Sequence, residues 1–152
     1  MSANLSASLA ASQPLPVVSA AAAPAAYGAM LLRLSLGVLF LAHGLLKVFV
    51  FTVPGTVQYF AGLGLPAIAA YATIAAEIGG GLLLVAGYRT RVVALALVPL
   101  LVGATLAHVP NGWVFSNPKG GYEFPVLWTL LLVVQALIGG GAHALTRSDD
   151  RA

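Results

Sequence analysis

The chain has 152 residues, of which 60% are hydrophobic and only 7% are charged, and its mean hydropathy is +0.97. A soluble domain devotes about a quarter of its residues to charged side chains, so these values exclude an ordinary soluble domain and predict a membrane protein. The net charge of +3 comes from scattered residues, which gives no basis for nucleic-acid binding. Because the chain has no cysteine, disulfides, thiolate metal sites and thiol redox chemistry are excluded for this subunit acting alone.

The beginning of the chain differs from the rest. Residues 1–26 are rich in Ala, Ser and Pro and carry no charge, which predicts a disordered tail. A secretory signal needs basic residues before a continuous apolar stretch. Here Pro14, Pro16 and Pro24 interrupt that stretch and no basic residue precedes Arg33, so we expect no signal peptide. Residues 147–152 are interpreted as a polar C-terminal tail.

Four apolar stretches lie within residues 27–146, at about 27–51, 66–87, 91–109 and 124–145. Each approaches the ~20 residues that an α-helix needs to cross the hydrocarbon core. Only helices and closed barrels satisfy the backbone in lipid, and these stretches lack the polar alternation of barrel strands. The predicted fold class is therefore all-α, a four-helix transmembrane bundle.

The basic residues predict the orientation of this bundle. Short cytoplasmic loops are enriched in Lys and Arg. If both termini are cytoplasmic, five of the seven basic residues lie on or near the inside: Arg33, Arg89, Arg91, Arg147 and Arg151. The longer connections, residues 52–65 and 110–123, then face outward. Apolar residues at helical spacing over 53–63 predict a short amphipathic helix at the interface in the first of them.

One face of the first stretch combines charged and small residues. Positions spaced three and four apart line up on a helix, and here they are Arg33, Gly37, Phe40, Gly44 and Lys47, with His43 beside them. The two glycines allow another helix to approach closely, and the charges indicate that this face points into the bundle. Alternatively, Arg33 and Lys47 reach outward to the two interfaces.

Glu77 is the only charged residue between Lys47 and Arg89, and Gly80 shares its helix face. A carboxylate near the bilayer centre costs on the order of several kcal/mol before compensation, so an intramembrane acid is a functional-site hypothesis. Helix rise places Arg33 about 6 Å from Glu77 along the axis of two antiparallel neighbours. We expect a buried ion pair between them that fixes helix register. Alternatively, Glu77 is a titrating or ligand-binding carboxyl.

The remaining polar residues gather toward the predicted outer side. His108, Asn111 and Glu123 flank the second outer loop, and we expect them to share a pocket with His43 and Lys47 above Glu77. In the same loop, Trp113 and Tyr122 are typical interfacial anchors. In the fourth stretch, Gln135 is expected to make an interhelical hydrogen bond, and His143 reads as an interfacial residue. Gly139 shares the face of Gln135, so we assign it to helix packing.

Five segments in this order, residues 33–49, 55–67, 76–91, 108–113 and 120–128, resemble the DoxX family of small bacterial membrane proteins. The resemblance covers residues 33–141 and implies a four-helix protein of the bacterial inner membrane. The wider superfamily includes DoxD, a subunit associated with thiosulfate:quinone oxidoreductase, and some members are linked to complexes that handle oxidative or thiol stress. The family positions correspond here to Arg33, His43, Gly44, Lys47, Glu77, His108, Gly112 and Glu123. The long N-terminal tail departs from the family pattern.

The chemistry of these polar residues suits the binding of a quinone. Its two carbonyl oxygens change their proton count on reduction, and histidine, lysine and carboxyl groups can handle those protons. Two alternatives stay open: a b-type haem held by His43 and His108, and a divalent metal held by His43, His108 and Glu123. We expect neither, and we expect no intrinsic cofactor, with a bound quinone as the one candidate.

Three classes of function remain. The first is a quinone-interacting or redox-associated subunit of a membrane oxidoreductase system, which would be part of an enzyme rather than a complete one. The second is a non-enzymatic accessory or scaffold subunit that packs with other membrane proteins. The third is a small-solute carrier, for which Arg33 and Glu77 inside the membrane are the only support.

Overall fold

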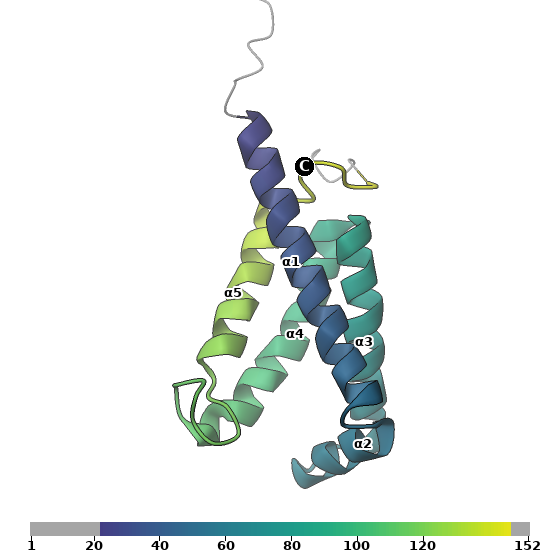
Figure 1. The fold of residues 1–152 in the computed structure, drawn as a ribbon, viewed down its shortest axis with the longest axis vertical. Coiled ribbons are helices and arrows are strands. Elements are labelled where there is room, and N and C mark those ends of the chain that lie inside the picture. Colours follow the sequence, from purple (N-terminus) through teal and green to yellow (C-terminus); the bar gives the residue numbers. More distant parts are fainter. Residues whose placement is uncertain (1–21, 147–152) are drawn as a thin grey trace, which may run out of the picture.

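The computed structural model describes residues 22–146, and all regular secondary structure in this part of the chain is helical (Figure 1). The predicted C-terminal tail and residues 1–21 of the predicted N-terminal tail lie outside the described residues. Residues 22–26 were also assigned to that tail, but α1 already begins at Ala22. The all-α fold class is confirmed.

The helices follow one another in the predicted order. They are α1 (Ala22–Phe49), α2 (Val53–Gly62), α3 (Ala67–Ala86), α4 (Thr90–His108), the 3-10 turn η1 (Val109–Asn111) and α5 (Glu123–Ile138). Within the described residues, three helices are long and apolar enough to cross a membrane, at Ala23–Phe49, Ala67–Ala86 and Thr90–Asn111. The apolar helix α5 has 16 residues and is therefore about 24 Å long, against about 30 Å for the hydrocarbon core. The short helix expected in the first long connection is α2, which is therefore confirmed as a helix.

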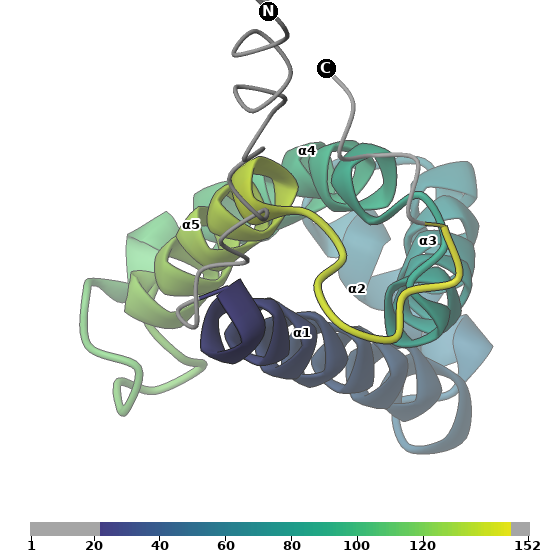
Figure 2. The same ribbon diagram turned by 90° about the horizontal axis from the view of Figure 1, so that it is seen from above.

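The four long helices form two closely packed pairs, α1 with α3 and α4 with α5 (Figures 1 and 2). Contacts between the pairs are fewer, and the pairs diverge toward the end of the bundle that carries α2. We call this the loop end, because residues 112–122 also lie there. The opposite end holds the start of α1 and the end of α3, and we call it the closed end.

Glycines bring α1 and α3 into close contact. A Cβ atom added to Gly37 would lie 2.9 Å from the carbonyl oxygen of Gly81, and one added to Gly44 would lie 3.2 Å from the Cβ of Glu77. Gly80 on α3 faces α4, since a Cβ atom there would lie 2.8 Å from Leu97. Side chains larger than hydrogen at these positions would push the helices apart.

The predicted fourth span is too long at its C-terminal end. Instead of continuing to residue 145, α5 ends at Ile138, and Gly139 and Gly141 have φ angles of 83° and 69°. Glycine adopts this left-handed region readily and commonly ends helices there. Gly139 is therefore a helix terminator, and its assignment to helix packing is wrong.

Residues 139–146 instead cross the closed end, as Figure 2 shows. The backbone N–H of Ala142 donates to the carbonyl of Ala26 in α1, and those of Leu145 and Thr146 donate to Ala86 and Gly87 at the end of α3. This segment joins the two helix pairs at one end only. The loop end has no such connection among the described residues.

The core lies where the two pairs meet, and its most deeply buried side chains include Leu36, Phe40, Leu84, Trp128 and Leu132. Large apolar side chains such as Leu31, Val38, Ile68, Val92 and Leu137 are instead exposed on the outside of the bundle. A bundle with an apolar core and an apolar exterior fits a lipid environment on all sides. The exterior of the helices is therefore the bilayer-contacting surface.

Candidate functional site

Glu77 forms an ion pair with Lys47. The Nζ atom of Lys47 in α1 lies 2.7 Å from Oε1 of Glu77 in α3, and the two side chains are 19% and 5% exposed. The contact at Gly44 brings the helix backbones together one turn before Lys47, so the lysine side chain can reach across to α3. Two charges buried together in this way offset part of each other's desolvation cost.

The predicted pair between Arg33 and Glu77 is wrong. Arg33 lies level with the end of α3, where its Nη1 donates to the carbonyls of Leu84 at 3.1 Å and Val85 at 3.0 Å. Leu84 is two turns beyond Glu77, about 10 Å along the helix axis. The prediction placed the inner ends of the two spans, residues 27 and 87, at the same level, whereas α1 begins at Ala22 and α3 ends at Ala86. Because α1 extends past the end of α3, Arg33 lies level with Leu84 and Val85 rather than close to the level of Glu77.

Arg33 stabilises the closed end of the bundle. Its Nη2 also donates to the carbonyl of Ala142, at 3.3 Å, and the side chain is 2% exposed. The last carbonyls of a helix lack intrahelical partners, and a cation there also interacts favourably with the helix dipole. Arg33 therefore ties α1, the end of α3 and the crossing segment together, and it takes no part in the environment of Glu77.

The second carboxylate oxygen of Glu77 is unused. Its Oε2 atom is buried and has no hydrogen-bond partner among the described residues. Leaving a buried polar atom unpaired costs about 1–3 kcal/mol, and more for a charged group. Such an atom is therefore a place where a ligand or a water would be bound.

The side chain of His43 in α1 packs against Trp128 in α5. The Nδ1 atom of His43 lies 2.9 Å from the carbonyl oxygen of Leu39, and because a carbonyl only accepts, Nδ1 is the protonated donor and Nε2 is left free. The rings of His43 and Trp128 have centroids 4.8 Å apart. Trp128 is 4% exposed, and its Nε1 atom is buried without a partner among the described residues.

These contacts define one site. His43 and Lys47 are one turn apart on α1 and share a face. Glu77 from α3 is paired with Lys47, and Trp128 from α5 packs on His43. The two residues thus approach the same face of α1 from neighbouring helices. We call His43, Lys47, Glu77 and Trp128 the central cluster. Sequence reasoning did not assign Trp128 to the site, although its spacing of seven from Gln135 places the two on one helix face and was a usable signal.

The remaining predicted site residues build the second long loop. Asn111 Nδ2 donates to the carbonyl of Gly120 at 2.9 Å, and the N–H of Phe115 donates to Oε1 of Glu123 at 2.8 Å. His108 donates from Nδ1 to the carbonyl of Ala104 at 2.8 Å. Asn111 and Glu123 are thus occupied in holding the loop, and the structure does not show the single shared pocket that we expected.

The proposed metal ligands are not brought together. Within residues 22–146, no group of three His, Cys, Asp or Glu side chains is arranged to hold a metal ion. His43 packs on Trp128, whereas the carboxylate of Glu123 accepts from the loop backbone. The alternative of a metal held by His43, His108 and Glu123 is therefore not supported by the geometry.

Gln135 also departs from its prediction. It is fully buried, and its Nε2 donates at 2.6 Å to the carbonyl of Gly139, one turn later in the same segment, rather than to another helix. The carbonyl of Gly139 lies just beyond the end of α5, where the helix backbone no longer supplies a donor, and this bond satisfies it. Gln135 is therefore part of the helix ending.

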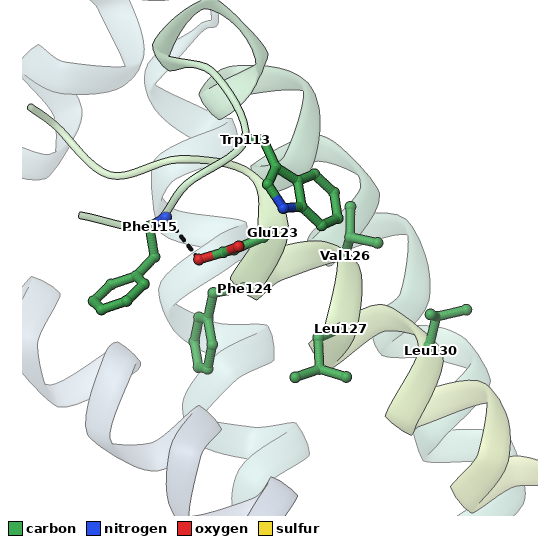
Figure 3. Close-up of a pocket in the computed structure, with 7 residues that line it drawn as sticks. All are labelled: Trp113, Phe115, Glu123, Phe124, Val126, Leu127 and Leu130. Atoms are coloured by element: carbon green, nitrogen blue, oxygen red, sulfur yellow. Dashed lines mark hydrogen bonds between the residues drawn. The ribbon is translucent and has the colours of Figure 1, made fainter. Parts of the chain in front are cut away.

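A groove of about 400 Å³ opens on the outside of α5 beneath the second loop (Figure 3). It is lined by Trp113, Phe115, Glu123, Phe124, Val126, Leu127 and Leu130. A second groove of about 220 Å³ follows between α4 and α5 and shares Val126 and Leu130 with the first. Both grooves are apolar except for the carboxylate of Glu123, and neither is lined by a residue of the central cluster. Their position suits lipid chains.

Comparison with known proteins places this arrangement in a sequence family. The sequence profile of the family DoxX matches residues 28–109, which include most of α1, all of α2, α3 and α4, and three members of the central cluster. The chain is 39% identical over 118 residues to a protein of Bacillus subtilis (strain 168) described as "Putative oxidoreductase CatD". The alignment covers 78% of this chain and 84% of that relative. No solved structure matches the chain.

Proposed function

This chain belongs to the DoxX family, and from that membership we propose that it is a quinone-interacting subunit of a bacterial membrane oxidoreductase system. The relative that is described as an oxidoreductase supports the reaction class. The central cluster supports the quinone. The observation that carries the proposal is Oε2 of Glu77, a buried carboxylate oxygen without a partner in a site that also offers the free Nε2 of His43.

The residues of the central cluster fit the ring oxygens of a quinone and its reduced form, because the ammonium group of Lys47 can donate to a carbonyl oxygen and Oε2 of Glu77 can accept from a hydroxyl of the reduced form. When bound, a quinone accepts two electrons and two protons and becomes a hydroquinone. Lys47, His43 and Glu77 are all able to hold or release a proton, and the ion pair keeps Lys47 within 2.7 Å of Glu77. The indole Nε1 of Trp128 adds a buried hydrogen-bond donor without a partner among the described residues.

We assign the source of the electrons to another subunit. The chain has no cysteine, and the part that the structure describes has no cluster of metal ligands. We propose no intrinsic cofactor and no haem, and we assign the electron-donating centre to a partner protein in the same membrane. In this arrangement the chain supplies a quinone site to a larger enzyme.

We propose the bacterial inner membrane as the location, with both termini in the cytoplasm. Arg33, Arg89 and Arg91 lie toward the closed end, which would then face the cytoplasm in agreement with the distribution of basic residues. The loop end, with α2 at the interface, would face outward. The central cluster then lies in the outer half of the membrane, since Lys47 is in the last turn of α1.

An accessory role without quinone binding is the second candidate. The observation that favours it is the apolar exterior of the helices, where side chains such as Leu31, Val38 and Leu137 can pack against another membrane protein as well as against lipid. A solute carrier has less support, because the closed-end side of Glu77 is filled by Leu36 and Leu84, which are 1% and 0% exposed.

Two measurements test the proposal. Organic extraction of the protein purified in mild detergent should yield isoprenoid quinone, detected by mass spectrometry, and the absorption spectrum should lack a haem Soret band. The chain contains two tryptophans, so Trp113→Phe leaves Trp128 as the only indole. A tail-less 1,4-naphthoquinone should then quench its fluorescence at saturable, micromolar concentrations.

Trp128→Phe is the matched control, because it leaves only Trp113, which is 52% exposed in the loop. We expect weak, non-saturating quenching in that variant. Equal quenching in both variants, together with an extract free of quinone, would contradict the proposal. Retention of oxidoreductase subunits on the purified protein in that case would favour the accessory role.

A further inference from the structure

The free atoms of the central cluster differ in what they can bind. The Oε1 atom of Glu77 is taken by Lys47, and a carboxylate paired with an ammonium group is ionised. Its free Oε2 therefore accepts hydrogen bonds and cannot donate one. The indole Nε1 of Trp128 has the opposite character, because it donates and cannot accept.

Both atoms are buried without partners, and they come from opposite helix pairs. Glu77 and Trp128 are each 4% exposed. Glu77 belongs to α3, in the pair α1 and α3, and Trp128 belongs to α5, in the pair α4 and α5. Both approach the face of α1 that carries His43 and Lys47. A ligand held between them would meet a hydrogen-bond acceptor from one pair and a donor from the other.

We propose that the central cluster recognises a ring hydroxyl group, which donates to Oε2 of Glu77 while Nε1 of Trp128 donates to a second oxygen of the same ligand. The proposed ligand form is a hydroquinone or a related phenol rather than a quinone. This inference rests on the proposed function and adds which form of the ligand the site prefers.

The preference follows from the chemistry of the two ligand forms. A quinone carries two carbonyl oxygens, which only accept, so one of them would face the carboxylate oxygen without a hydrogen between them. A hydroquinone replaces that repulsive contact by a charge-assisted hydrogen bond, one of the stronger kinds in proteins. One such bond changes an affinity by at least about tenfold.

The groove beneath the second loop comes close to the cluster. Phe124, on the outside of α5, is one of the residues that line this groove (Figure 3). Phe124, which is 42% exposed, packs on Trp128 with ring centroids 5.6 Å apart. Phe124 is therefore the side chain that lines the groove on one side and contacts the central cluster on the other.

The test uses two ligands that differ by one hydroxyl group. 4-Methoxy-1-naphthol carries one hydroxyl and one ether oxygen, whereas 1,4-dimethoxynaphthalene carries two ether oxygens and cannot donate. Binding of each to the purified full chain is measured by equilibrium dialysis in mild detergent, with protein-free micelles correcting for partition. We expect the naphthol to bind at least about tenfold more tightly.

Glu77→Gln is the matched variant, because an amide of the same shape both accepts and donates. The ratio of the two affinities should fall to within about twofold of unity in this variant, since the charged acceptor is lost. Trp128→Phe should weaken both ligands by the same factor and leave the ratio unchanged. Size-exclusion chromatography and thermal unfolding establish that each variant is folded, and the ratio in the wild-type protein carries the test if a variant is not.

The outcomes separate this inference from the proposed function. Equal affinities in the wild-type protein, together with saturable quenching of Trp128 by the naphthoquinone, would overturn the hydroxyl preference and leave quinone binding in place. A preference that persists in Glu77→Gln would overturn the role given to Glu77. If no naphthalene compound bound and no quenching occurred, both proposals would fall.

Discussion

Lys47 and Glu77 face each other across the α1–α3 contact with 2.7 Å between Nζ and Oε1, one turn beyond the point where Gly44 lets the two helices meet. The close backbone contact and the ion pair depend on each other, because the lysine reaches the carboxylate only while the helices stay in this register. The pair also leaves the second carboxylate oxygen of Glu77, Oε2, without a partner among the described residues, and both proposals use this atom.

Removal of the lysine charge should destabilise the protein strongly. In Lys47→Met, Glu77 would be left buried and unpaired, and we expect a loss of about 3 kcal/mol in the free energy of unfolding, near the lower end for buried pairs because Lys47 is 19% exposed. Reversible unfolding in mixed micelles measures it. The control is Lys119→Met, an exposed loop position that should change stability by less than about 0.5 kcal/mol. Similar small losses in both variants would contradict a buried pair.

A methyl group at the α1–α3 contact should separate the two helices. A Cβ atom in Gly37→Ala would lie 2.9 Å from the backbone oxygen of Gly81, and we expect a destabilisation of about 2 kcal/mol. Gly79→Ala is the matched control on α3, since no atom lies within 4 Å of the added carbon. That variant should be neutral or stabilised by up to about 1 kcal/mol, because alanine favours the helix. The thermal unfolding temperature should therefore fall in Gly37→Ala and stay level or rise in Gly79→Ala.

Arg33 should matter for the closed end and not for ligand binding. In Arg33→Met, the carbonyls of Leu84, Val85 and Ala142 lose their guanidinium donors, and we expect a loss of about 3 kcal/mol. Hydrogen exchange followed by mass spectrometry should show faster exchange in residues 139–146. Affinity for the naphthoquinone should change by less than about twofold relative to the wild type, since Arg33 lies about 10 Å from the level of Glu77. A much larger loss of affinity would place Arg33 in the binding site after all.

Glu123 provides a comparison between the two glutamates in the described residues. Glu123→Gln weakens the hydrogen bond from the N–H of Phe115 and should loosen the second loop, which the emission of Trp113 reports. The charge-assisted bond is worth about 1.5 kcal/mol more than the neutral one at most. Ligand affinity should stay unchanged, whereas Glu77→Gln should alter it. If both variants lost affinity equally, the outer polar residues would form the single pocket that the sequence suggested.

Most of the fold could be predicted because the length of an apolar stretch largely determines whether it forms a membrane-spanning helix. The stretches around Glu77 and Pro99 are long, uninterrupted and bounded by turn residues, so their helices were placed to within a residue or two. The end of α5 was missed because Gly139 and Gly141 are as apolar as the helix before them. Hydropathy does not distinguish a glycine inside a helix from one that ends it.

Most residues of the candidate site could be predicted from the sequence, but the ion pair between Lys47 and Glu77 could not. Glu77 and Lys47 were recognised as functional candidates from their charge in an apolar setting. Their pairing was missed because it depends on the axial offset between α1 and α3, which the contacts of Gly37 and Gly44 determine in three dimensions. Trp128 was overlooked because an aromatic residue in a membrane helix is usually assigned to packing or to the interface.

Recognition of a ligand hydroxyl requires that Glu77 is an ionised carboxylate with one oxygen free to accept a hydrogen bond. The most direct measurement is the infrared difference spectrum of the protein with and without 4-methoxy-1-naphthol, recorded for the wild type, Glu77→Gln and Glu123→Gln. We predict a ligand-induced change in a carboxylate stretching band that is present in the wild type and in Glu123→Gln and absent in Glu77→Gln. A spectrum that is identical in all three proteins would contradict the recognition of a ligand hydroxyl by Glu77.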